Sequence, residues 1–216
     1  MKKNKIFLIS VVAFAVIAFG LFTFLSRTEK NEKIDRAQVS VDNSLLIKDH
    51  SPSKGSVDAK VTIVEFLDPE CEACRAMHPI MKALLQEYEG KVRLVIRYMP
   101  FHGNSLFAAS TLEEARDAGK FDEALDVLFE KQPEWANHGS PRPELIPIFL
   151  REIGIDEKRL ESSIVISKHR WKVDMDQSDG EKLGVRATPT FFVNGEMLSQ
   201  IGYDPVKQAI EKALAN

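Results

Sequence analysis

The fold is decided by residues 61–74, which read VTIVEFLDPECEAC. The first seven of these residues are mostly apolar and β-branched, so Val61–Leu67 predicts a buried strand. After Cys74, apolar residues recur at helical spacing as far as about Tyr88. A Cys-x-x-Cys pair therefore joins the end of a strand to the start of a helix.

This junction gives the two cysteines different surroundings. Cys71 meets free backbone N–H groups and the positive end of the helix dipole, whereas Cys74 lies one turn deeper. Both effects favour the thiolate of Cys71, and a thiolate is the nucleophile of disulfide exchange. We therefore expect redox chemistry at this pair; an inert structural disulfide is the alternative.

Length and composition set limits on the other possibilities. The chain has 216 residues, enough for one domain of about 165 residues with appendages. Its net charge is −3 and it has no basic tract, so nothing indicates a nucleic-acid partner. Two cysteines and five dispersed histidines do not supply the ligand spacing of a zinc site. We expect no metal and no nucleic acid.

The N-terminus has the pattern of a membrane anchor. Lysines at positions 2, 3 and 5 precede an uncharged apolar run from Ile6 to Leu25, which is long enough to span a bilayer as a helix. A cleaved signal peptide has a shorter apolar core and ends in a small-residue cleavage site, which this run lacks. We expect residues 1–25 to be an uncleaved transmembrane helix; a signal peptide cleaved near Gly20 is the alternative.

The lysines also predict the side of the membrane on which the rest of the chain lies. The positive-inside rule places the lysine-rich end in the cytoplasm, so the body of the protein is exported. Outside the cytoplasm, dithiols can be oxidised and disulfides persist. Residues 26–50 are polar and read as a linker with one short added strand. Turn-forming residues 51–55 then mark the start of a folded domain, 51–216.

Within that domain the pattern alternates before it becomes helical. Val92–Met99 predicts a second strand, and Pro100 stops it. An all-helical insertion follows at about residues 103–184. Its predicted helices are Ser105–Ala118, Phe121–Lys131, Glu144–Gly154, Asp156–His169 (with Asp156 as the N-cap) and Lys172–Leu183.

The chain then returns to strand. Thr190–Val193 and Glu196–Leu198 flank Asn194-Gly195, which is a strong hairpin signal. A final helix is predicted over Pro205–Leu214, with Asp204 as its cap. The order βαβ, helices, hairpin, helix implies an α/β fold with a mixed central sheet flanked by helices.

Two separated motifs carry a resemblance to a known family. Residues 64–74 (VEFLDPECEAC), followed by Pro79, and residues 187–195 (ATPTFFVNG) resemble the thioredoxin superfamily. The helical insertion makes the chain similar to the DsbA-like branch of thiol–disulfide oxidoreductases, over roughly residues 51–214. The resemblance implies a thioredoxin-like fold and a protein thiol–disulfide oxidoreductase.

The same resemblance implies roles for five residues. Cys71 is expected to attack and Cys74 to resolve, the two forming the redox-active disulfide. Pro189 matches the cis-proline packed against the dithiol, and Thr188 offers backbone hydrogen bonds to an extended substrate. Glu65 falls where the branch has a buried acid. Burial raises the pKa of a carboxyl, which suits Glu65 to relay the proton of Cys74. The alternative is a strand carboxylate with no such role.

The chain departs from the strongly oxidising members, which have Pro-His between the cysteines. Here Glu72-Ala73 stands between them, with Asp68 and Glu70 close by. We expect these acids to oppose ionisation of Cys71, which makes the protein a weaker oxidant; Arg75 and His78 offset part of this.

Other side chains are expected to be structural. The run 113–117 (EEARD) has the composition of a solvated helix face, and Trp135 and Trp171 are expected to pack the helices of the insertion. His78 and His102 are expected to be surface or packing residues.

The sequence as a whole predicts an extracytoplasmic thiol–disulfide oxidoreductase that acts on cysteine-containing proteins through a mixed disulfide at Cys71. Oxidation is modestly favoured. The alternatives are a reductase or isomerase, an electron carrier dedicated to one partner, and a non-enzymatic binding or chaperone module.

The expected location is the cytoplasmic membrane, with a single span and the catalytic domain outside, in the periplasm of a Gram-negative cell; cleavage of the signal gives a soluble protein. The cysteines carry the electrons, so no cofactor is implied, and a membrane redox partner must recycle them. The short linker leaves no room for a dimerisation domain, so a monomer is expected.

Overall fold

The computed structural model describes residues 43–216. The predicted anchor, residues 1–25, lies outside the described residues, as does most of the predicted linker. Within the described part of the chain, no helix has both the length and the apolar character needed to cross a membrane.

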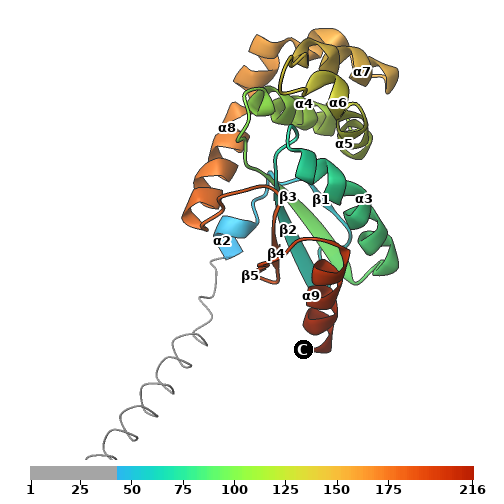
Figure 1. The fold of residues 1–216 in the computed structure, drawn as a ribbon, viewed down its shortest axis with the longest axis vertical. Coiled ribbons are helices and arrows are strands. Elements are labelled where there is room, and N and C mark those ends of the chain that lie inside the picture. The colour runs from blue at the N-terminus through green and yellow to red at the C-terminus, as the bar shows by residue number, and fades with distance from the viewer. Residues whose placement is uncertain (1–42) are drawn as a thin grey trace, which may run out of the picture. The chain divides into compact units, whose positions relative to one another are not determined.

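The core of the fold is a mixed five-stranded sheet in the order β1-β3-β2-β4-β5 (Figure 1). β2 and β3 run parallel, with Val61 opposite Val92, and the other three pairs are antiparallel. Because β2 is central and covered on both faces, its sequence is an apolar run without alternation. The strands are β1 (Ser53–Lys54), β2 (Val61–Leu67), β3 (Val92–Tyr98), β4 (Thr190–Val193) and β5 (Glu196–Met197).

Helices cover both faces of the sheet, which confirms the predicted α/β fold with a mixed central sheet flanked by helices. α3 and α9 lie on one face and α2 and α8 on the other, while α4 to α7 lie together beyond one end of the sheet (Figure 1). The helices are α2 (Asn43–Leu46), α3 (Glu72–Glu87), α4 (Ser105–Asp117), α5 (Phe121–Glu130), α6 (Gln132–Trp135), α7 (Ile146–Glu152), α8 (Ser162–Lys182) and α9 (Tyr203–Ala215). Short 3₁₀ turns at Pro143–Leu145 and Glu157–Leu160 complete the insertion.

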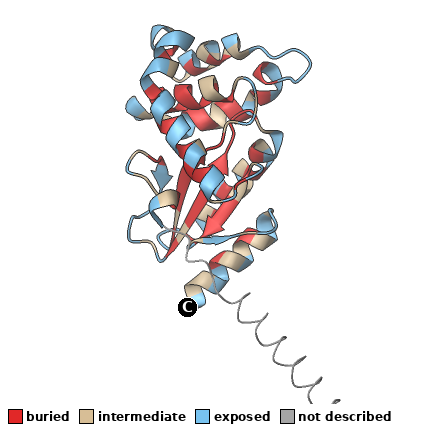
Figure 2. Ribbon diagram, turned by 90° about the vertical axis from the view of Figure 1, so that its left-hand side faces the viewer, coloured by how far each residue is buried: buried red, intermediate tan, exposed pale blue. Residues whose placement is uncertain are grey.

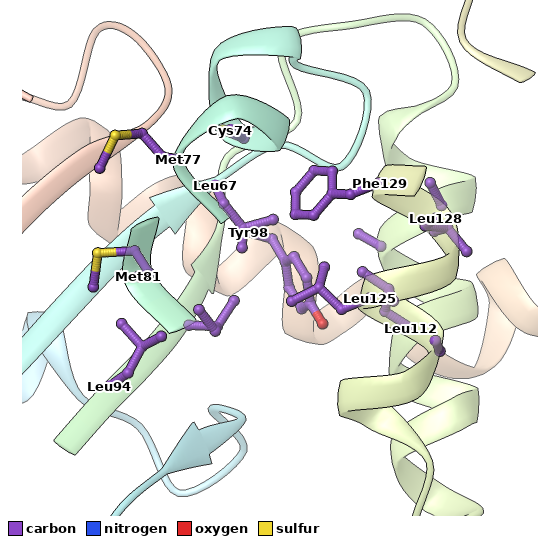
Figure 3. Packing of buried hydrophobic residues seen from close by; sticks show 14 of the residues in the cluster. Leu67, Cys74, Met77, Met81, Leu94, Tyr98, Leu112, Leu125, Leu128 and Phe129 are labelled. Atoms are coloured by element: carbon purple, nitrogen blue, oxygen red, sulfur yellow. The ribbon is translucent and has the colours of Figure 1, made fainter. Parts of the chain in front are cut away.

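Each face of the sheet has its own hydrophobic cluster, and Figure 2 shows the strands buried between them. In the larger cluster, Leu125 and Phe129 of α5 approach Leu67, Tyr98 and the region of Cys74 (Figure 3). The helical insertion therefore shares a core with the sheet and with the start of α3.

The smaller cluster holds α8 against the other face of the sheet, at very close range. A Cβ added to Gly180 would lie 2.9 Å from Met99 Sδ and 3.0 Å from Phe66 Cε1. Any larger residue at this crossing would require the side chains of Met99 and Phe66 to shift.

Several sequence predictions require correction. Residues 156–183, predicted as two helices, form one 3₁₀ turn and the continuous helix α8, because neither Arg170 nor Trp171 breaks a helix. The apolar residues near position 45 form the helical turn α2, and the predicted turn at 51–55 contains strand β1. α9 begins at Tyr203, which puts Asp204 in its first turn and not at the cap. Asp156 is confirmed as a cap, because its side chain accepts from the Lys158 N–H.

The charged run in α4 is not a solvated face. Glu113 is 0% exposed and Glu114 is 3% exposed, because α8 packs over them with its own charged side chains. Periodicity alone does not show which helix will cover a charged face. Trp135 is fully buried as predicted, whereas Trp171 is 53% exposed.

Candidate active site

The two cysteines lie where β2, α3 and the loop before β4 meet. Cys71 is the N-cap residue of α3 and is partly buried, whereas Cys74 in the first turn is completely buried. Both are free thiols in this structure. Cys71 Sγ lies 3.3 Å from the carbonyl oxygen of Thr188, and the Asp68 N–H lies 3.5 Å from Cys74 Sγ. Two distant segments of the sequence therefore converge on the dithiol.

The two thiols differ sharply in acidity. A hydrogen bond from Cys74 lowers the pKa of Cys71 to about 5, against the effect of burial and with further help from the Thr188 side chain and the backbone of α3. Burial raises the pKa of Cys74, and its hydrogen bond to Cys71 and the charge of Glu65 raise it further. At neutral pH the first sulfur is a thiolate and the second a thiol.

This outcome corrects the expected effect of the nearby acids. Asp68 and Glu70 are buried, and donors surround them: Asp68 accepts from Glu70 N–H, Phe101 N–H and the Ser105 hydroxyl, at 2.5–2.8 Å. Asn104 donates to Glu70 through its backbone and its side chain, at 2.7 Å and 2.9 Å. These acids organise the loop around the dithiol without preventing ionisation of Cys71.

His102 belongs to the site, although the sequence predicted only a surface or packing role for it. Its Nδ1 lies 2.7 Å from Asp68 Oδ2, and its ring lies 5.8 Å from the ring of His138. Burial opposes protonation of His102, but the bond to Asp68 and the charge of Cys71 raise its pKa. An imidazole whose pKa is raised by Asp68 and Cys71 thus comes to the site from the loop after β3, and not from between the cysteines.

Gln132 is a second residue that the sequence did not indicate. Its amide donates to the carbonyl oxygens of Pro69 and Cys71, at 2.9 Å and 3.0 Å, from α6 of the insertion. A glutamine far along the chain has no local signal for such a contact.

The loop opposite the dithiol has the predicted cis bond between Thr188 and Pro189. Pro189 is buried, and the next residue, Thr190, pairs with Phe66 of β2. The pairing of β4 with β2 thus carries this loop to the carboxyl end of β2, next to Cys71.

Glu65 lies within β2, between Ile96 of β3 and Phe191 of β4. It is 4% exposed, and among the described residues no hydrogen bond to its carboxyl group is found. Burial raises its pKa to about 8. Near neutral pH this carboxyl group therefore both holds and releases a proton.

One other cluster has the residue types of a metal site. Ligand atoms of Glu114, Asp117 and His169 lie within 4.8 Å of one another. Lys168 Nζ lies 2.7 Å from Glu114 and 2.8 Å from Asp117, and Arg159 also bonds Glu114. Protein cations thus already neutralise these oxygens.

A mixed sheet that presents a Cys-x-x-Cys at a helix start, against a cis-proline loop, defines the class of thioredoxin-fold thiol–disulfide oxidoreductases. The comparisons with known proteins agree. The family model described as thioredoxin matches residues 48–212, and the chain belongs to this family, in its DsbA-like branch. The protein is a thiol–disulfide oxidoreductase.

Two kinds of relative match the sequence. Disulfide bond formation protein D of Bacillus subtilis is 30% identical over 195 residues, which cover 85% of this chain and 86% of that protein. The Na⁺/H⁺ antiporter NhaA of Herminiimonas arsenicoxydans is 34% identical over 149 residues, and these are 67% of this chain but 22% of the antiporter. The chain thus matches about a fifth of the antiporter's length.

Solved structures show the same fold. Oxidised BdbD from Bacillus subtilis superposes with a TM-score of 0.70 at 29% identity, covering 77% of this chain and 94% of that one. A thioredoxin-like oxidoreductase from Silicibacter pomeroyi gives a TM-score of 0.67 at 25% identity, covering 81% and 98%.

Proposed function

We propose that this protein oxidises dithiols of cysteine-containing proteins outside the cytoplasm, with Cys71 as the attacked sulfur and Cys74 as its partner. The observation that carries the proposal is the low pKa of Cys71, about 5. A stabilised thiolate favours the reduced form of the protein, so its disulfide is readily given away. The name of the Bacillus subtilis relative, disulfide bond formation protein D, agrees with this direction.

The reaction has two exchange steps. A substrate thiolate attacks Sγ of Cys71, the bond between Cys71 and Cys74 breaks, and Cys74 leaves with the electron pair and takes a proton. The second substrate thiolate then attacks the substrate sulfur of the mixed disulfide. A substrate disulfide forms, Cys71 leaves as a thiolate, and two electrons remain on the protein. A membrane redox partner accepts these electrons and restores the disulfide.

Three further residues support this reaction in the proposal. Thr188 offers backbone hydrogen bonds to an extended substrate segment, and Pro189 shapes the loop that presents them. Glu65 supplies the proton when Cys74 leaves and accepts it in the reverse step, for which a pKa of about 8 is well matched.

The reduction potential of the full chain in detergent tests the direction. We expect a value between the −120 mV of the strongest oxidant of this kind and roughly −200 mV. A value near that of thioredoxin, about −270 mV, would assign a reductase instead. In cells, an oxidant is found mainly as disulfide, and a reductase or isomerase mainly as dithiol.

Paired cysteine variants test the residues. Cys71→Ser should abolish oxidation of a reduced protein substrate. Cys74→Ser has no disulfide to give to a reduced substrate, but its Cys71 thiolate should attack a protein that already carries a disulfide and accumulate a mixed disulfide that a thiol reductant releases. Undiminished activity of Cys71→Ser would leave only a binding or chaperone role.

The proposed location is a single membrane span at residues 1–25 with the catalytic domain outside. Labelling of Cys71 in intact cells by a membrane-impermeant thiol reagent tests the side of the membrane. N-terminal sequencing of the mature protein tests whether the segment is cleaved.

A further inference from the structure

A cavity of about 50 Å³ lies in the seam between the sheet, α3 and α5. Its polar lining comes from four elements, β1, β2, α3 and α5: Ser53, Lys54, Glu65, His78, Lys82, Asp122 and Asp126. Met81, Leu94 and Leu125, which also line it, come from α3, β3 and α5 (Figure 3). A site that is partly polar and several times larger than the roughly 10–15 Å³ that one water needs is able to hold water.

Glu65 lines this cavity and is itself 4% exposed. It lies close enough to Cys74 for its charge to act on that thiol, and the described residues offer its carboxyl group no hydrogen bond. A buried carboxyl group that relays a proton must exchange it with a second titratable group or with water. The cavity that Glu65 lines is also lined by other polar side chains.

His78 lines the same cavity. Its Nε2 lies 2.6 Å from Asp126 Oδ1, and Lys82 Nζ lies 2.7 Å from Asp126 Oδ2. The His78 side chain is 20% exposed, so the imidazole reaches both the cavity and solvent. Lys54 and Asp122 form a separate ion pair, at 2.5 Å, on another part of the lining.

We propose that His78 exchanges protons between Glu65 and solvent through water in this cavity. The inference rests on the proposed function. When the dithiol is recycled, Cys74 attacks the mixed disulfide that Cys71 has formed with the redox partner. The bound partner covers the exposed side of the dithiol, so that side is closed to protons. The seam between the sheet and the insertion remains open.

Atoms and electrons balance in this step. The Cys74 thiol gives its proton to the Glu65 carboxylate, and its sulfur forms the bond to Cys71 Sγ. The bond between Cys71 and the sulfur of the redox partner breaks, and that sulfur leaves with the electron pair. Glu65 then returns to the carboxylate by passing its proton through cavity water to the imidazole of His78, which releases it to solvent.

A chromogenic disulfide, dithiobis(nitrobenzoate), resolves the step in the reduced full chain. Attack by Cys71 releases one coloured thiolate, and attack by Cys74 on the mixed disulfide releases a second. In His78→Gln the amide can still donate to Asp126 but cannot take up and release a proton near neutral pH, so we expect the second release to slow about tenfold while the first is unchanged. Added imidazole should restore part of the lost rate.

The matched control is Asp122→Asn, which changes a charge on the cavity lining outside the route and should leave both releases at the wild-type rate. A second release at the wild-type rate in His78→Gln would overturn the inference. Equal slowing of both releases would also overturn it, because it would assign His78 a structural role.

The same assay separates this inference from the proposed function. If Cys71→Ser still gives both releases, the proposed function fails. If Glu65→Gln slows the second release and His78→Gln does not, the function stands and only the route through His78 fails.

Discussion

Two buried glutamates, Glu65 in β2 and Glu113 in α4, differ in their partners. Glu113 accepts from the Tyr98 hydroxyl at 3.0 Å, from Arg116 at 2.6 Å and from Lys172 at 2.7 Å. Glu65 has Cys74 and a cavity beside it, and no ion pair to its carboxyl group is found within residues 43–216. The Glu113 carboxylate is paired with cations and stabilises the packing of α4 against α8. The Glu65 carboxyl group has no such pair in the described part of the chain and is able to take up and release a proton.

The largest expected effect is on the pH dependence of stability. Burial raises the pKa of Glu65 from 4.5 to about 8, so the folded state binds a proton that the unfolded state has released. The stabilisation is fully present below pH 4.5 and is lost as the pH rises to about 8 and beyond. Relative to Glu65→Gln, reduced wild type should lose about 4 kcal/mol over this window, measured by urea unfolding in detergent. A constant difference between the two proteins would show that the group is not buried as described.

Removing the charge of Glu113 should affect the stability of the protein and not its reaction rate. Glu113→Gln leaves Lys172 buried without its carboxylate, which should cost about 3 kcal/mol of unfolding free energy. The rate at which Cys74 resolves a mixed disulfide should not change. Loss of that rate in a protein that remains folded would mean that the two glutamates do not have separate roles.

Unlike Glu113→Gln, Glu65→Gln is expected to change the rate at which Cys74 resolves a mixed disulfide. Without an acid beside Cys74, resolution of the mixed disulfide should slow about 100-fold, the lower limit for positioned acid–base catalysis. Stopped-flow release of the chromogenic thiolate gives the rate. Unaltered kinetics would assign Glu65 to structure, together with Glu113.

The smallest effect concerns His102, a partly exposed group that acts on the other thiol. Wild-type Cys71 should be alkylated by iodoacetamide with a midpoint near pH 5. His102→Ala removes a cation from the vicinity of this thiolate and should lower the alkylation rate at pH 5 about twofold. An unchanged midpoint would show that the hydrogen bonds from Cys74 and Thr188 account for the acidity on their own.

The sequence predicted what is encoded locally. The strand Val61–Leu67, the helix after the dithiol and the Asn194-Gly195 hairpin follow from periodicity and turn chemistry, and the residues 187–195 indicated the cis-proline loop. The contacts between distant segments were not predictable in this way. The burial of the acids in α4 depends on how α8 packs across that helix. The contacts of His102 with Asp68 and of Gln132 with Cys71 depend on the path of the insertion.

The hydrogen bonds of the Gln132 amide restrict the number of residues that the chain can have between α5 and α6. One amide ties the carbonyl groups of Pro69 and Cys71, and only Lys131 separates α5 from α6. Adding or removing a single residue there would rotate the amide by about 100° around the helix axis and away from both carbonyl groups. The hydrogen bonds from Gln132 to the loop that carries the dithiol therefore fix the number of residues between α5 and α6. We expect insertions or deletions to be tolerated better in the loop after α7 than between α5 and α6.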